Sequence, residues 1–220
     1  MLFDLEKESL LASGVKDRRQ LVEYRGKLNQ FAKQFTDEMK GVWGPTDRAK
    51  GLFAWLWERK PDRYEPRGHF RLNDVIDAER SKENRAVGNC LGLTLLYQCL
   101  LKKLDVRPEA LHLENAFGMG PHVLTVLQAG GSTIDIENIL PDGFGYEGHL
   151  KNPSRTKWGD TELVADIYHS VGNEWFEKGE FAKALRSYEM AVKLNPQYEK
   201  AYLNKAIVMD RLGKGRREKT

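Results

Sequence analysis

The chain has 220 residues and a formal net charge of +3, and 40% of its residues are hydrophobic. This hydrophobic fraction is ordinary for a globular protein and excludes disorder as the main state. No apolar run approaches the roughly 20 residues that a membrane-spanning helix needs, so the sequence predicts no membrane partner.

The net charge is concentrated at the C-terminal end. The last eight residues, GKGRREKT, contain four basic residues and one acidic residue, which accounts for the whole excess. A nucleic-acid-binding protein is expected to carry basic residues across a face of its fold, so we expect no nucleic-acid partner. The opening MLFDLEKESLLASGV lacks the basic and then apolar order of a signal peptide, which predicts a cytoplasmic protein.

Residues 1–60 are expected to be helical. Apolar residues recur there at spacings of three and four between charged ones: Leu21, Tyr24, Leu28, Phe31 and Phe35. Gly44-Pro45 interrupts this pattern, and Thr46-Asp47 suits the start of a second, aromatic-rich helix.

The centre of the chain predicts a buried helix followed by strands. Residues Gly88–Leu104, GNCLGLTLLYQCLLKKL, are apolar on nearly every side, which is typical of a helix inside a core. Three short runs of strand composition follow, separated by turn residues: Ala110–Leu113, His122–Leu127 and Thr133–Ile136. A helix followed by an antiparallel meander indicates an α+β domain. We place it at residues 1–159, with a helical part at 1–60 and a core at 70–140.

Residues 140–159 are expected to form a loop. The segment contains GFGYEG at 143–148, a single match to the glycine pattern of dinucleotide-binding folds. That pattern binds a pyrophosphate only where it joins a strand to a helix. Here it continues into HLKNPS, which cannot begin a helix at once, so we predict no cofactor.

The C-terminal segment contains an internal repeat of 34 residues, in which Tyr168 aligns with Tyr202. The repeat ends in LNP at 194–196 and resembles the tetratricopeptide repeat. Small residues at Gly172 and Ala184 are expected to let two helices approach closely, with Trp175 and Tyr188 filling the space between them. We therefore predict a unit of about one and a half repeats at 160–220, ending in the basic tail, that docks a protein partner.

Two cysteines lie in the central helix. Cys90 and Cys99 are about 13 Å apart at a rise of about 1.5 Å per residue, too far for a disulfide. Cys99 is expected to be a buried, inert thiol. Cys90 begins the helix, where the macrodipole and the unpaired backbone N–H groups favour a nucleophilic thiolate. The same N–H groups could stabilise an oxyanion.

His122 and Asp135 complete a candidate catalytic set with Cys90. A hairpin with its turn around residues 129–132 is expected to place His122 nearly opposite Asp135. The carboxylate would then orient the imidazole, which would take the proton of the Cys90 thiol. Asn89, beside the thiol, is a candidate oxyanion donor, and Glu114 and Asn115 are candidate cleft residues.

This order of Cys, His and Asp resembles the transglutaminase-like superfamily of papain-type thiol enzymes. The resemblance rests on GNCLGLTLLYQCLLKKLDVRPEAL, HVLTVL and STIDIEN, within roughly residues 70–140. With the repeat that follows, the chain resembles a bacterial branch that carries a short tetratricopeptide tail. The resemblance implies Cys90 as nucleophile, His122 as base and Asp135 as orienting residue. It also implies a protein or peptide substrate, with hydrolysis, deamidation or acyl transfer at a carboxamide.

Two alternatives to the enzyme stay open on the sequence. The fold could serve as a protein-interaction scaffold without catalysis, because members of the branch it resembles often lack the cysteine. An anion-binding module would use the basic tail.

His112 with Glu114, and Asp135 with Glu137, place metal-capable groups on common strand faces, but no third cluster completes a site, so no metal is predicted. His69 and His149 have no recognisable partner.

Overall fold

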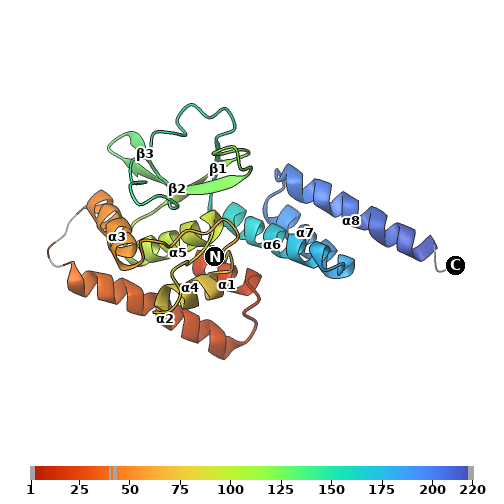
Figure 1. The fold of residues 1–220 in the computed structure, drawn as a ribbon, viewed down its shortest axis with the longest axis horizontal. Helices are drawn as coiled ribbons and strands as arrows, with labels where there is room; N and C mark the ends of the chain where they lie inside the picture. Colours follow the sequence, from red (N-terminus) through yellow and green to blue (C-terminus); the bar gives the residue numbers. More distant parts are fainter. Residues whose placement is uncertain (1–2, 40, 42–43, 218–220) are drawn as a thin grey trace. The chain divides into compact units, whose positions relative to one another are not determined.

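The computed structural model describes residues 3–39, 41 and 44–217, and these form eight helices and four strands (Figure 1). The elements in chain order are α1 (Leu5–Ala12), α2 (Arg18–Glu38), α3 (Pro45–Arg59), α4 (Leu72–Arg80), α5 (Cys90–Lys103), β1 (Glu109–Leu113), β2 (His122–Ala129), β3 (Ser132–Ile136), β4 (Thr156–Trp158), α6 (Asp160–Glu177), α7 (Phe181–Leu194) and α8 (Glu199–Arg217). The chain divides into two compact units between Asp160 and Thr161, here called the N-terminal and C-terminal units. Within the described ranges, no helix combines the length and apolar character needed to cross a bilayer.

Helix α5 is the centre of the N-terminal unit. All residues from Leu91 to Leu101 are buried, which confirms the prediction of a core helix. The surrounding helices α1 to α4 pack against it, and β2 packs against it as well (Figure 1). Tyr97 shows how closely α3 approaches, because its hydroxyl donates to the carbonyl oxygen of Ala49 at 2.7 Å. Partners on several sides explain why α5 carries no polar stripe.

The sheet is antiparallel, with the strand order β3-β2-β1-β4. The three predicted strands are present, and the mixture of helices and an antiparallel sheet is as expected. The expectation that residues 140–159 are loop throughout is wrong at β4, which pairs with β1. A strand of three residues is too short to show alternation, and Trp158 is held instead by stacking on His112, with ring centroids 4.1 Å apart.

The turn between β2 and β3 fixes a register that differs from the expected one. Gly130 and Gly131 have φ values of 57° and 87°, and Ala129 pairs with Ser132 across them. Two central residues with positive φ are typical of a tight hairpin turn, and glycine adopts them without strain. Asp135 is therefore opposite Val126, and the predicted pairing of Asp135 with His122 is wrong.

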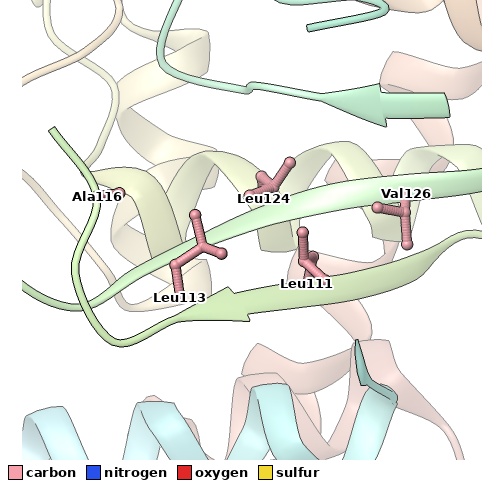
Figure 2. Close-up of a cluster of buried hydrophobic side chains, with 5 residues drawn as sticks. All are labelled: Leu111, Leu113, Ala116, Leu124 and Val126. Atoms are coloured by element: carbon pink, nitrogen blue, oxygen red, sulfur yellow. The ribbon is translucent and has the colours of Figure 1, made fainter. Parts of the chain in front are cut away.

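The two faces of the sheet have different neighbours. Figure 2 shows an apolar cluster on β1, β2 and the turn that follows β1: Leu111, Leu113, Ala116, Leu124 and Val126. Successive side chains alternate between faces, so Thr125 points to the opposite side from Leu124. There Asn138 donates to the hydroxyls of both Thr125 and Thr94, at 2.9 and 3.1 Å. Thr94 belongs to α5, so this amide joins the helix to the second face.

The C-terminal unit is built from α6, α7 and α8. A Cβ atom on Gly172 would lie 2.5 Å from the ring of Tyr188, so α6 and α7 approach closely at this position, as predicted. Ala184 and Tyr188 are buried there with Val208 of α8, and Trp175 packs partly buried against them. The predicted basic tail continues α8 as far as Arg217, and its last three residues lie outside the described residues.

Candidate active site

Cys90 is the first residue of α5 and is half-buried. Asn89 caps the helix, because its Oδ1 accepts a hydrogen bond from the backbone N–H of Gly92 at 3.1 Å. The backbone N–H of Asn89 donates to the carbonyl oxygen of His69 at 3.0 Å, and a Cβ atom on Gly92 would overlap that oxygen. Glycine at 92 therefore lets the start of the helix pack tightly, which fixes the position of the thiol at the helix N-terminus.

His122, the first residue of β2, is 6% exposed and connects Cys90 to a buried carboxylate. Its Nε2 lies 2.9 Å from Oε1 and 2.8 Å from Oε2 of Glu137. The Cys90 thiol is also a neighbour of His122 and contributes to the raised pKa of the imidazole. Because Nε2 faces Glu137, Nδ1 is the ring nitrogen that remains available to the thiol.

The electrostatics of this group favour charged side chains. Burial would lower the pKa of His122, but the hydrogen bonds and negative charges of Cys90 and Glu137 outweigh burial and raise the pKa to about 10. For Glu137 the two effects are reversed. Burial alone would raise its pKa, yet the hydrogen bonds from His122 and His149 hold the pKa below its usual range. An imidazolium beside a carboxylate is thus the favoured state of this pair.

Asp135 is not the partner of His122, and the predicted orienting contact is wrong. Its carboxylate oxygens accept hydrogen bonds from Arg155, at 2.7 and 3.0 Å. The hairpin register is the reason, because it places Asp135 opposite Val126. The carboxylate that contacts His122 belongs to Glu137, two residues further along the chain. The Gly130-Gly131 pair was the sequence signal that could have given the correct register.

The loop that contains GFGYEG holds the backbone of Glu137. The N–H of Glu137 donates to the carbonyl oxygen of Gly143 at 2.8 Å, and a Cβ atom on Gly143 would overlap the carbonyl oxygen of Glu137. The N–H groups of Gly145 and Tyr146 both donate to the carbonyl oxygen of Asp135, at 2.9 and 3.0 Å. The glycine pattern therefore lets a loop lie directly against the end of β3.

His149, from the same loop, shares the carboxylate with His122. Its Nε2 lies 3.1 Å from Oε2 of Glu137, and the residue is 4% exposed. Phe117 and Tyr146 pack against its ring, with centroids 4.7 and 5.0 Å away. The prediction that His149 has no partner is therefore wrong. One ligand atom each from His122, Glu137 and His149 lie within 4.8 Å of one another, a spacing that suits a metal ion.

The remaining candidates have structural contacts of their own. Glu114 donates its backbone N–H to Ser154, and Asn115 accepts the N–H of Gly120 on its side chain, both at 3.0 Å. These bonds shape the turn that leads into β2, and a role of either residue in a cleft stays a prediction. Tyr64 is a neighbour that the sequence did not indicate: burial and the negative charges of Cys90 and Glu137 raise its pKa.

Comparisons with known proteins identify a repeat in the C-terminal unit. A family model described as "TPR repeat" matches residues 172–213, which confirms the predicted repeat and supports a protein-interaction module. The chain is also 40% identical over 50 residues to an uncharacterized protein of Methanocaldococcus jannaschii. That alignment covers 23% of this chain and 58% of the length of the archaeal protein. No solved structure matches the chain.

Proposed function

We propose that the N-terminal unit is a transglutaminase-like thiol enzyme in which Cys90, His122 and Glu137 act on a carboxamide or peptide bond. One observation carries this proposal: His122 contacts a buried carboxylate and has as a neighbour a half-buried thiol at a helix N-terminus, which contributes to its raised pKa. A nucleophile, a base and a group that orients the base are the parts of a catalytic triad. Glu137 takes the orienting role that the sequence assigned to Asp135.

The first half of the reaction forms a thioester. His122 accepts the thiol proton, and the Cys90 sulfur attacks the carbonyl carbon of the substrate. The oxyanion of the resulting tetrahedral intermediate is stabilised by N–H groups at the start of α5, with the Asn89 side chain as a further candidate donor. The C–N bond then breaks, and the imidazolium of His122 gives its proton to the departing amine or ammonia.

The second half releases the acyl group. His122 accepts a proton from water or from an amine, and that oxygen or nitrogen attacks the thioester carbon. The C–S bond breaks and the thiol is restored when the imidazolium returns its proton to the sulfur. Water gives hydrolysis or deamidation, and an amine gives acyl transfer. In this proposal the C-terminal unit docks the protein substrate or its carrier, which agrees with the general use of tetratricopeptide repeats.

The test is the rate of Cys90 alkylation by iodoacetamide at pH 6, in chelator-containing buffer, followed by mass spectrometry. An ordinary thiol has a pKa of about 8.5 and is less than about 1% thiolate at pH 6. We expect Cys90 to react at least about tenfold faster than a cysteine in an unstructured peptide. Cys99 is 2% exposed and burial raises its pKa, so it provides an unreactive internal reference.

The matched variants are His122→Gln and His69→Gln. His69 is an exposed histidine of the same unit. We expect His122→Gln to remove the enhancement and His69→Gln to leave it intact. A Cys90 that reacts like the peptide thiol, with no effect of His122, would refute the thiol-enzyme proposal.

A second candidate function is a protein-interaction scaffold, which the tetratricopeptide match favours. Under this function, a Cys90→Ser protein retains every biological activity of the chain. Complementation of a deletion strain by Cys90→Ser separates the two candidates. Full complementation would support the scaffold, and loss of complementation by a folded variant would support the enzyme.

A further inference from the structure

The strongest feature left unexplained by the thiol chemistry is that two histidines contact one carboxylate. A single imidazole is sufficient to pair with a triad carboxylate, yet Oε2 of Glu137 is 2.8 Å from His122 Nε2 and 3.1 Å from His149 Nε2. Both histidines turn the same ring nitrogen toward the same oxygen. All three residues are buried, at 0 to 6% exposure.

We infer that His122, Glu137 and His149 form a binding site for a divalent transition metal ion such as Zn²⁺. Two imidazole nitrogens and one carboxylate oxygen form a ligand set that Zn²⁺ accepts, with a fourth position left for water. Ligand bonds of about 2.0 to 2.2 Å at tetrahedral angles separate neighbouring ligand atoms by roughly 3.3 Å. The observed separations of 2.8 to 3.1 Å between nitrogen and oxygen need only small displacements to reach that value.

The surroundings of the three ligands also suit a metal site. Phe117 and Tyr146 fix the ring of His149, and Arg155 donates to its backbone carbonyl at 3.0 Å. The loop at Gly143 holds the backbone of Glu137. Metal sites depend on such outer contacts, because ligands that are already oriented lose little freedom on binding. The three ligands are buried, unlike an exposed group of acidic side chains. His122 begins β2, Glu137 directly follows β3, and His149 lies in the loop before β4.

The binding test is a titration of the full-length protein with Zn²⁺ at pH 7.5 in competition with a chromophoric chelator. We expect one ion per chain, and a loss of affinity of at least about tenfold in both His149→Gln and Glu137→Gln. His69→Gln is the matched control and should bind as the wild type does. Circular dichroism identifies any variant that fails to fold, and the other variant then carries the test. Equal affinity of the wild type and a folded His149→Gln would overturn the site.

A Cys90→Ser variant separates this site from simple thiol coordination. We expect its Zn²⁺ affinity to stay within about threefold of the wild type, and a loss of more than tenfold would overturn the inference. Ordinary Cys90 reactivity in chelator would refute the thiol enzyme and leave the metal site standing.

Discussion

His122 Nε2 faces both carboxylate oxygens of Glu137, at 2.9 and 2.8 Å, from the first residue of β2 to the residue just after β3. The contact joins two strands beyond the point where their backbone pairing ends, because the ladder between β2 and β3 stops at Thr125 and Ile136. Side chains therefore hold the strand ends together at this site.

Replacing Glu137 should separate the effects of the two nearby carboxylates. We expect Glu137→Gln to lower the alkylation rate of Cys90 at pH 6 by roughly 10- to 100-fold, because an amide stabilises the imidazolium of His122 far less than a carboxylate does. Asp135→Asn is the matched control. It should change the rate by less than threefold while costing about 1–3 kcal/mol of stability, since its contact is with Arg155. The reverse ranking of the two rates would return the orienting role to Asp135.

The stability of the N-terminal unit should depend on the ionisation of Glu137. Hydrogen bonds from His122 and His149 lower its folded-state pKa against the opposing effect of burial. A carboxyl group with a lowered folded-state pKa stabilises the fold above its unfolded pKa of about 4.3, and this stabilisation is lost as the pH falls through the folded value. Urea unfolding of the wild type and Glu137→Gln should therefore show the largest difference near pH 7 and a shrinking difference below about pH 4. A difference that grows on acidification would contradict this linkage.

Gly143→Ala should disturb the site without touching a polar side chain. Its new Cβ would overlap the carbonyl oxygen of Glu137, so the loop or the end of β3 must shift. We expect a loss of about 1–3 kcal/mol in unfolding free energy together with slower Cys90 alkylation. Gly26→Ala is the control, because no atom lies within 4 Å of the Cβ position at this helical site. That substitution should stabilise α2 by about 0.5–1 kcal/mol. Wild-type alkylation in Gly143→Ala would show that the loop does not position Glu137.

A buried ion pair supports the segment that leads to Cys90. Arg63 donates to Glu79 at 2.8 Å, and their side chains are 4% and 1% exposed. The next residue, Tyr64, forms a bridge with Gly88, two residues before the thiol. Glu79→Gln should cost about 3–5 kcal/mol, because it leaves the guanidinium buried without a counter-charge. An Arg63→Met/Glu79→Leu double variant should recover most of the lost thermal stability, and a double variant less stable than Glu79→Gln would show that the pair is itself stabilising.

The sequence predicted the parts of the fold that rest on local pattern. The continuous apolar character of Gly88–Leu104 predicted a core helix, and the small residues Gly172 and Ala184 predicted the close approach of two helices. The short strand β4 was missed, because Thr156–Trp158 is defined by pairing with β1 and not by its own periodicity.

The site was predicted in part, because its members come together through tertiary contacts. Cys90 and His122 were indicated by a helix start and a strand start. Glu137 was missed because its identification requires the hairpin register, which a small error in the turn position changes. His149 was missed because it lies in a loop whose path depends on the close approach of Gly143 to Glu137, and no local pattern encodes that path.

The position of Cys90 separates folding from reactivity. The start of α5 is fixed by the Asn89 cap and by the close packing of Gly92 on the backbone of His69. The carboxylate of Glu137 is held by His149 as well as by His122. None of these contacts involves the side chain of Cys90. A change of sulfur to oxygen at residue 90 would leave those contacts in place. A lineage carrying this architecture can therefore lose or regain the thiol at residue 90 in one mutational step and keep the same three-dimensional structure.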